Sequence, residues 1–392
     1  MAGKEALAQA NRNKKDEFYT QLVDVEKELR HYRDQLRGKV VFCNCDDPYE
    51  SSFFKYFAMN FNHLGLKKLI TTCYTGSPIT GEQLSMLDVD GIPEGTPERS
   101  AYRVEITEVP DANNDGAIDL ADVEYLLKSE RNVLTLLADN GDFRSAECVA
   151  LLGEADIVVT NPPFSLFREY LALLTEHDKK FVIIGNTNAL TYTEVFKLIK
   201  EDKLRTGYTN FNVGMFFHVP DDWEKYHHVD DDGRKVARVS ASCWFTNLDV
   251  EKHREHLTLY KQYSAEEYPR YDNYDAIEVS RYIDIPYDFA GPMGVPVTFI
   301  DKYNPEQFEI LGMTNGRDEF EARPTKRYAN VRQIMPDGTE SNGSKVNTGP
   351  ALLMAQRPAT GTVYVAEEVD GFLVRTYMRI VVRNRDPRKV PA

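Results

Sequence analysis

The sequence of 392 residues contains no run of 18 consecutive apolar residues, so no segment has the length and composition of a transmembrane helix. The N-terminal stretch is polar and lacks the apolar centre of a signal peptide. Cysteine is scarce, and its five residues have neither the spacing of zinc ligands nor the even number of a disulfide framework. These absences argue against a membrane protein and against a disulfide-stabilised secreted protein. We therefore expect a cytoplasmic protein with reduced cysteines and no membrane contact.

An excess of positive charge is also missing. The net charge is −15, which taken alone argues against a nucleic-acid partner. The charge is uneven, however: residues 321–392 contain 12 Lys and Arg against 7 Asp and Glu. This part therefore carries +5, and residues 1–320 carry −20. A local basic surface can contact phosphates while the rest of a chain is acidic, so composition leaves the partner open.

Short apolar runs alternate with helical patterns over the first two thirds of the chain. The expected strands are 40–45, 67–74, 131–138, 155–160 and 180–186, and the expected helices are 16–37, 53–61, 164–175 and 191–201. Such alternation predicts an α/β fold with a mostly parallel sheet and helices on both faces. The segments 215–219 and 236–248 are expected to be a pair of strands. Beyond residue 258 we expect a second region without a long helix.

The most informative motif is Asn161-Pro162-Pro163-Phe164, directly after the expected strand 155–160. Two prolines end a strand abruptly, and they fix the backbone so that the Asn161 side chain and the Pro162 carbonyl can point at one spot. Two rigid acceptors beside an aromatic face suit a planar group with an exocyclic amine, such as a flipped adenine. The alternative is a tight strand-to-helix turn with Asn161 as a capping residue. One motif alone does not decide between them.

Acidic residues follow two other expected strands. Asp46 and Asp47 come after the strand 40–45, and Asp142 with Phe143 comes after the strand 131–138. Ligands of open α/β sheets bind at the carboxyl ends of the strands, and acidic residues there often contact a nucleoside. Each Asp alone is more often a helix cap or a turn residue. Their occurrence in this order favours a nucleoside cofactor.

Together these motifs resemble those of adenine-N6 DNA methyltransferases, and more narrowly those of the EcoRI-type modification methyltransferases. The similarity covers most of residues 14–312 and includes Asp16-Glu-Phe-Tyr-Thr-Gln, Val40–Pro48, Gly141–Ser145, Asp156–Tyr170 and Gly294-Val-Pro-Val-Thr-Phe. It implies a Rossmann-like class I methyltransferase domain over residues 1–258, with an irregular insert at about 75–130. It also implies a C-terminal α+β region, 259–392, that recognises the DNA target.

The resemblance further implies that S-adenosyl-L-methionine donates a methyl group to adenine N6 in duplex DNA, with the base flipped into the site. The implied catalytic residues are Asn161, Pro162, Pro163 and Phe164. The implied cofactor-binding residues are Phe18, Tyr19, Thr20, Asn44, Asp46, Asp47, Pro48, Asp142 and Phe143. The run Asn44-Cys45-Asp46-Asp47-Pro48 stands where other methyltransferases are rich in glycine. A second aromatic for base stacking is expected among Phe211, Phe216 and Phe217.

The same resemblance implies a monomer that acts beside a cognate restriction endonuclease without contacting it. Two alternatives remain. One is a methyltransferase acting on RNA adenine or on a protein amide nitrogen, because motifs of this kind serve those groups too. The other is a non-catalytic DNA-binding relative.

The insert contains a loop that the resemblance does not explain. Oxygen-bearing side chains stand at its positions 1, 3, 5, 9 and 12, with glycine at position 6: Asp111, Asn113, Asp115, Asp119 and Asp122. This spacing is typical of a calcium-binding EF-hand loop. The alternative is an Asp- and Asn-rich turn that caps the next helix. A calcium ion there would be structural and would take no part in the chemistry.

Overall fold

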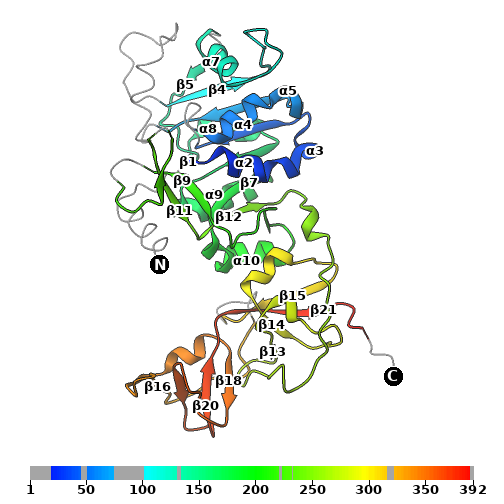
Figure 1. Cartoon of the computed structure of the whole chain (residues 1–392), viewed down its shortest axis with the longest axis vertical. Helices are drawn as coiled ribbons and strands as arrows, with labels where there is room; N and C mark the ends of the chain where they lie inside the picture. Colours follow the sequence, from blue (N-terminus) through cyan, green and yellow to red (C-terminus); the bar gives the residue numbers. More distant parts are fainter. Residues whose placement is uncertain are drawn as a thin grey trace. The chain divides into compact units, whose positions relative to one another are not determined.

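The structure is a computed structural model that describes residues 19–45, 51–74, 101–129, 134–219, 223–231, 233–315 and 322–388. The chain forms two compact units (Figure 1). The first consists of residues 1–189 and 204–250, and the second of residues 190–203 and 251–392. Each unit has two β-sheets of its own. Within the described ranges no helix is both long and apolar enough to cross a membrane.

The first unit is built on an eight-stranded sheet. Its strand order is β5 (Leu134–Leu136), β4 (Tyr102–Ile106), β3 (Lys68–Thr72), β2 (Val40–Asn44), β6 (Ile157–Thr160), β7 (Lys180–Asn186), β12 (Ser242–Thr246) and β8 (Arg205–Thr206). The four central strands, β3-β2-β6-β7, are parallel. The strands outside them run antiparallel to their neighbours. The predicted α/β fold is thus confirmed, with a parallel centre and antiparallel margins.

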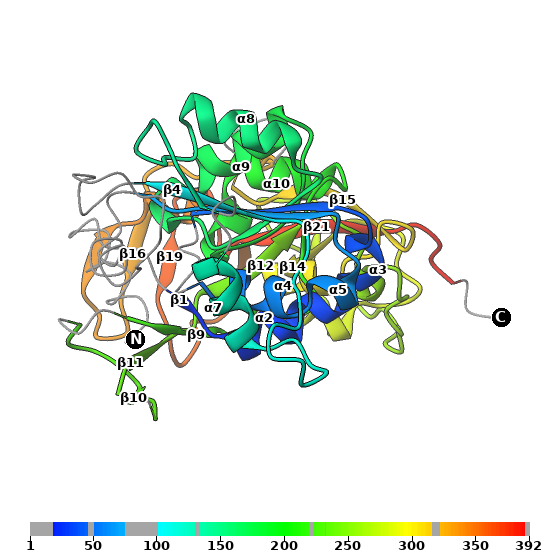
Figure 2. The ribbon, with the colours of Figure 1, turned by 90° about the horizontal axis from the view of Figure 1, so that it is seen from above.

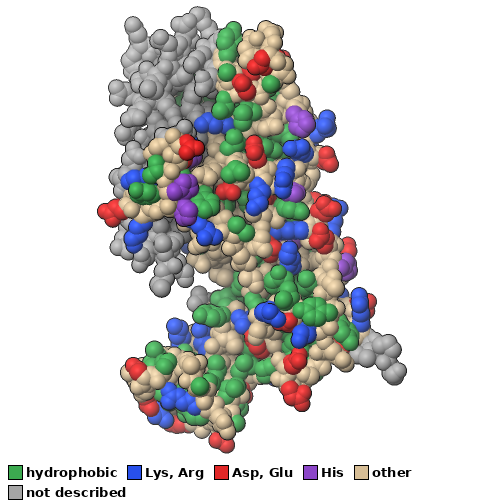
Figure 3. All heavy atoms as spheres, in the orientation of Figure 1, with side chains coloured by type: hydrophobic (Ala, Val, Ile, Leu, Met, Phe, Trp, Pro, Cys, Tyr) green, Lys and Arg blue, Asp and Glu red, His purple; other side chains and the backbone are tan. Residues whose placement is uncertain are grey.

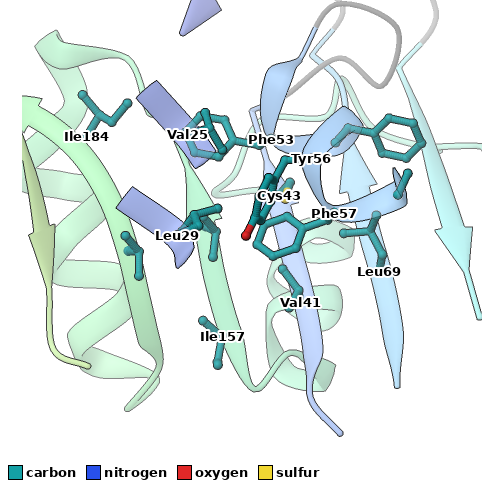
Figure 4. Packing of buried hydrophobic residues seen from close by; sticks show 14 of the residues in the cluster. Val25, Leu29, Val41, Cys43, Phe53, Tyr56, Phe57, Leu69, Ile157 and Ile184 are labelled. Atoms are coloured by element: carbon teal, nitrogen blue, oxygen red, sulfur yellow. The ribbon is translucent and has the colours of Figure 1, made fainter. Parts of the chain in front are cut away.

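Helices cover both faces of this sheet (Figure 2). On one face lie α8 (Ala146–Glu154) and α9 (Phe167–Glu176), and on the other lie α2 (Leu22–Leu29), α4 (Ser52–Met59) and α5 (Phe61–Leu64). Strands β2 and β6 are buried along their whole length, as their continuous apolar runs predict. In the core shown in Figure 4, Val25 and Leu29 of α2 and Phe53 and Phe57 of α4 pack over Val41 of β2.

The helix expected over residues 16–37 is only partly correct. Tyr19–Thr20 form a short strand, β1, which pairs with β9 (Met215–His218). Residues 16–18 lie outside the described ranges, and α2 begins at Leu22 and continues as a 3₁₀ turn, Arg30–Tyr32, and α3 (Arg33–Leu36). Tyr and Thr favour strands, and the edge of β9 offers them backbone partners. Tertiary pairing therefore overrides the helical pattern at this end.

The strand expected over residues 236–248 is two strands in two different sheets. β11 (Lys235–Val239) pairs with β9, as expected, and belongs to a small sheet of order β1-β9-β11-β10, with β10 at His228–Val229. After a turn at residues 240–241 the chain continues as β12 in the large sheet. All five residues of β12 are buried, because β12 lies between β7 and β8, whereas β11 has an exposed residue, Arg238.

The insert and the second unit contain the remaining elements. The insert supplies β4, β5 and α7 (Leu120–Ser129), while residues 75–100 lie outside the description. The second unit contains α10 (Thr193–Lys200), whose Lys200 Nζ donates to the Leu311 carbonyl at 2.8 Å. Past residue 250 the described helical segments are 3₁₀ turns, so no long helix is found there, as expected, but the α+β character implied for residues 259–392 is not confirmed.

The strands of the second unit form two sheets. One has the order β13 (Ile277–Glu278), β14 (Met293–Pro296), β21 (Arg379–Asn384) and β15 (Phe308–Met313). The other has the order β17 (Glu340–Asn342), β16 (Arg332–Ile334), β19 (Val363–Val365), β20 (Phe372–Arg375) and β18 (Ala351–Met354). The second sheet is antiparallel throughout.

Candidate active site

The motif Asn161–Phe164 begins where β6 ends, at the carboxyl edge of the parallel strands. Pro162 is buried, and Asn161 and Phe164 are half-buried. Phe164 opens a 3₁₀ turn that leads into α9, and the N-cap positions of these two helical segments are Pro163 and Leu166. Asn161 is therefore not the capping residue of the alternative interpretation. Asn161 directly follows the end of β6, and its role as an acceptor for a ligand stays a prediction.

An aromatic contact joins this motif to the small sheet. The rings of Phe164 and Phe217 lie edge to face, with centroids 6.4 Å apart and an interplanar angle of 88°. Phe217 is fully buried on β9, directly opposite Thr20 of β1. Phe216 points the other way, and its ring meets the His227 ring at 5.3 Å. Of the three aromatic candidates, Phe217 makes a ring contact with Phe164.

The end of β2 is tied to the end of β6. The Thr160 hydroxyl donates to the Asn44 carbonyl, and the Tyr170 hydroxyl on α9 donates to the Asn44 side-chain oxygen. Cys45, the next residue, has φ of 74°, a left-handed conformation that glycine usually supplies. The chain therefore turns sharply at the end of β2 without a glycine. Phe18, Asp46, Asp47 and Pro48 lie outside the described residues, so their predicted contacts stay predictions.

Asp142 and Phe143 are held next to these strand ends. The preceding Gly141 has φ of 77°, and a Cβ there would lie 2.1 Å from the Cys73 carbonyl oxygen, so only glycine fits. This close approach anchors the motif against the end of β3. The buried Phe143 ring meets the Tyr170 ring edge to face at 5.0 Å. Phe143 and Asn44 are thus joined through Tyr170.

The Asp142 carboxylate is ion-paired. Arg144 donates from Nε to Oδ1 at 2.9 Å and from Nη2 to Oδ2 at 2.7 Å. These hydrogen bonds lower the pKa of Asp142 below its ordinary value, so the group is ionised at neutral pH. The same guanidinium reaches Glu169 of α9 at 2.9 Å. Asp142 is therefore an acceptor-only group fixed in one orientation.

Two residues of this site, Tyr170 and Arg144, were not among the predicted site residues, although both lie in runs that carry the family resemblance. Tyr170 lies 126 positions from Asn44, and no spacing rule connects a strand end to a helical tyrosine so distant. Arg144 is half exposed and next to a motif, which is equally typical of a solvated surface residue. A hydrogen bond or ion pair between distant elements appears only once the chain has folded.

The loop predicted as a calcium site is not supported. Among the described residues, no group of three or more His, Cys, Asp or Glu side chains is placed to hold a metal ion. The loop's oxygen atoms accept backbone N–H groups of the loop itself. Asp111 accepts from Gly116 at 2.8 Å, and Asp115 accepts from Ala117 at 2.9 Å.

The other three side chains of that loop behave in the same way. Asn113 accepts from the Asp115 amide, Asp119 from the Ala121 amide, and Asp122 from the Ala112 and Asp119 amides. Asp122 is buried and closes the loop at the start of α7. The arrangement fits the alternative of an Asp-rich turn at a helix start.

Comparison with known proteins gives a family. The family description "Adenine-specific methyltransferase EcoRI" matches residues 6–385. The chain is 44% identical over 318 residues to Type II methyltransferase M.EcoRI of Escherichia coli, covering 80% of this chain and 90% of that protein. It is 38% identical over 309 residues to Type II methyltransferase M.MpnI of Mycoplasma pneumoniae, covering 77% of this chain and 83% of that protein. It is 34% identical over 332 residues to Type II methyltransferase M.MgeORF184P of Mycoplasma genitalium, covering 83% of this chain and 91% of that protein. No solved structure matches the chain.

Proposed function

The chain belongs to the EcoRI family of adenine-specific methyltransferases, and we propose that the carboxyl edge of its large sheet is the site of methyl transfer. Family membership makes the protein an adenine-specific, site-specific DNA methyltransferase of the restriction–modification type. The reaction moves a methyl group from S-adenosyl-L-methionine to adenine N6. The proposal assigns the steps of that reaction to residues of this chain.

The strand order supports a Rossmann-like class I methyltransferase domain. The chain passes from β2 to β3 on one side and later returns to β6 on the other side of β2. The order therefore reverses between β2 and β6, and ligands of open α/β sheets bind outside the carboxyl ends at such a point. Strand β2 ends at Asn44, and Asn161 directly follows the last residue of β6. The proposed catalytic motif and Asn44, a proposed cofactor contact, therefore lie at the two strand ends on either side of this reversal point.

The residues present fit the cofactor. The Thr20 hydroxyl is buried and has no hydrogen-bond partner among the described residues, so a donor or acceptor of a ligand would satisfy it. The Asp142 carboxylate accepts hydrogen bonds, as an adenine amine requires. S-adenosyl-L-methionine supplies an electrophilic methyl group on a sulfonium. We assign its methionine end to Tyr19, Thr20 and Phe18, and its adenosine end to Asn44, Asp142 and Phe143. Asp46, Asp47 and Pro48 complete the proposed set.

Asn161 and Pro162 orient the target amine. An aromatic amine is a poor nucleophile because its lone pair is delocalised into the ring. The Asn161 side-chain oxygen and the Pro162 carbonyl, each accepting from one N6–H, favour a tetrahedral nitrogen whose lone pair points at the methyl group. This is catalysis by positioning and electrostatics, and it needs no strong base. The rigid Pro162-Pro163 backbone holds both acceptors in place.

Phe164 receives the flipped base. Its half-buried ring makes an edge-to-face contact with Phe217, which braces it. Stacking on an aromatic ring contributes about 1–3 kcal/mol per base, which offsets part of the cost of unstacking in the duplex. Phe217 itself is fully buried and braces Phe164 rather than meeting the base.

We assign DNA target recognition to residues 259–392. The support is charge: residues 321–392 carry +5 in a chain of −15. Lys and Arg side chains are visible over the second unit in Figure 3. Arg327, Lys345 and Arg388 are among the exposed cations there. Binding through phosphates predicts a steep loss of affinity with salt. We further propose that the protein acts as a monomer in the cytoplasm, beside a cognate endonuclease that it does not contact.

The observation that carries the proposal is that Asn161–Phe164 and Asn44 lie at the carboxyl edge of the large sheet, where Tyr170 contacts Phe143. Thr20 of the small sheet lies opposite Phe217, which contacts Phe164. The test is transfer of a labelled methyl group from S-adenosyl-L-methionine to unmethylated duplex DNA, followed by mapping of N6-methyladenine. Single-stranded RNA and an acceptor peptide with a glutamine amide are the parallel substrates. Label in duplex DNA at one sequence context supports the proposal. Label only in RNA or peptide, or cofactor and DNA binding without transfer, contradicts it.

A further inference from the structure

We propose that Arg144 is the positioning residue for the adenine of the methyl donor, acting through Asp142 and Phe143. The inference rests on the proposed function, because it takes Asp142 and Phe143 as the adenine contacts. Arg144 touches both residues at once, and it ties them to the helix that follows the catalytic motif. Its predicted effect is on cofactor affinity and on the choice of purine.

The first part of the argument is the geometry around Asp142. Arg144 donates to both carboxylate oxygens through its side chain, and its backbone N–H donates to Oδ1 at 2.9 Å. Asn140 Oδ1 accepts from the Asp142 amide at 3.0 Å, so the backbone is held as well. A bidentate Arg–carboxylate pair fixes a plane, which a single point charge cannot do. The remaining lone pairs of Asp142 therefore point in a set direction.

The second part is the contact with Phe143. The Arg144 guanidinium carbon lies 5.0 Å from the centroid of the Phe143 ring, within the range of a cation–π interaction. The same ring also makes the edge-to-face contact with Tyr170. Arg144 also reaches Glu169, the neighbour of Tyr170 on α9. The guanidinium thus contacts both the Phe143 ring and α9, and α9 contacts the same ring through Tyr170.

The third part is the chemistry of recognition. An ionised carboxylate only accepts hydrogen bonds, so it pairs with the 6-amino group of adenine and opposes the 6-oxo group of hypoxanthine. The charged or titratable groups around Asp142 are Arg144 on its own loop, Glu147 and Cys148 on α8, and Glu169 on α9. Arg144 is the cation among them, and its hydrogen bonds keep the pKa of Asp142 low. Removing Arg144 should raise that pKa.

The experiment measures binding of S-adenosylhomocysteine and of S-inosylhomocysteine to full-length protein without DNA, by calorimetry over a range of pH. The proteins are wild type, Arg144→Ala, Arg144→Lys, Asp142→Ala and the matched control Arg168→Ala, an exposed arginine of α9. Melting temperatures are recorded for each. We expect Arg144→Ala to weaken adenosine-ligand binding about 10-fold and to reduce the preference for adenine over hypoxanthine.

The pH profile separates positioning from a merely structural role. Binding needs ionised Asp142, so affinity is full above the pKa of Asp142 and is lost as pH falls through it. In wild type that loss begins at low pH, since the pKa is lowered. In Arg144→Ala it should begin at higher pH, and Arg144→Lys should restore the wild-type onset but not the full affinity. Arg168→Ala should match wild type.

The failures are distinguishable. Unchanged binding in Asp142→Ala would overturn the proposed cofactor site itself. Weakened binding in Asp142→Ala with wild-type affinity, pH profile and purine preference in Arg144→Ala would overturn only the role of Arg144. A lowered melting temperature in Arg144→Ala without a shifted pH profile would show a structural role and would also overturn it. If Arg144→Ala does not fold, the same comparison is made with Arg144→Lys, for which full wild-type affinity contradicts the bidentate geometry.

Discussion

The carboxyl edge of the large sheet and the loop 111–122 both carry clustered polar side chains that the sequence singled out, yet the structure treats them differently. At the sheet edge, Asn44, Tyr170, Phe143 and Asn161 come from four separate segments and converge. In the loop, the polar groups hydrogen-bond to backbone amides a few residues away. In each region the spacing of the motif predicts a functional site. The difference teaches that convergence of distant elements is the better sign of a reaction site.

Burial separates the two regions as well. Asn44, Phe143 and Tyr170 are buried, so the sheet edge is preorganised, and its polar groups are costly to leave unpaired. In the loop Asp115 and Asn113 are exposed, and Asp122 is the buried member. Changes at the sheet edge should therefore affect chemistry, and changes in the loop should affect local stability. Four predictions test this contrast.

The largest expected effect is that of Asn161→Ala. Loss of one positioned acceptor for the target amine should lower the rate of methyl transfer by about 10²–10³-fold, as for other preorganised hydrogen-bonding groups in active sites. The cofactor dissociation constant should not change, because the lost contact is to the base. Asn60→Ala, on the far end of α4, is the control. Single-turnover rates and calorimetry check both statements, and near-wild-type turnover would refute the assignment.

Phe164→Ala should have the next largest effect. The variant loses a stacking contact of about 1–3 kcal/mol, so kcat/KM for DNA should fall by about 10–100-fold with cofactor affinity preserved. Phe164→Tyr keeps the ring and should retain most of the activity. Fluorescence of 2-aminopurine at the target position reports base flipping directly. An equal signal for Phe164→Ala and wild type would show that the ring does not hold the base.

A smaller effect is expected from Asp122→Ala. The variant removes the acceptor of the Ala112 amide at 2.8 Å and of the Asp119 amide at 2.9 Å. The melting temperature should fall by a few degrees, while methyl transfer stays at the wild-type rate. Asp115→Ala, an exposed loop position, is the control and should fall less. All melts are run in chelator so that only protein hydrogen bonds are compared. Loss of methyl transfer in a folded Asp122→Ala variant would contradict the prediction that changes in the loop affect only local stability.

The smallest effect is that of pH through Asp24 on α2. Burial raises the pKa of Asp24 above that of the unfolded chain, so its charged form is disfavoured in the folded protein. Its contribution to the free energy of unfolding is therefore largest at acid pH and is lost as pH rises through the folded pKa. Asp24→Asn keeps an acceptor for the Phe216 amide at 3.3 Å and should be slightly more stable at pH 7.

The gain in Asp24→Asn should shrink as the pH is lowered. Asp34→Asn, at an exposed position on α3, is the matched control. Urea unfolding at pH 7 and pH 4 measures the difference. A gain that grows at acid pH would contradict the burial argument.

The sequence determined the elements and the local chemistry. Continuous apolar runs predict buried parallel strands, and two prolines predict where β6 stops, because these effects are local. The bounds of β2, β3, β6 and β7 agree with the expected strands to within a few residues. The residues Asn161, Phe164, Asp142 and Asn44 could be chosen as candidates for the same reason: each follows or ends a strand.

Tertiary structure decided which candidates meet. Pairing with β9 makes Tyr19–Thr20 a strand rather than a helix, and it brings Thr20 opposite Phe217 and so close to the catalytic motif. The contact of Tyr170 with Asn44 and that of Arg144 with Glu169 depend on the packing of α9 and on the turn at Gly141. The sequence therefore did not predict them. The loop 111–122 shows the converse, because its spacing is equally regular but its oxygens are taken by its own backbone. Local sequence sets conformation, whereas contacts between distant segments depend on packing that no short pattern encodes.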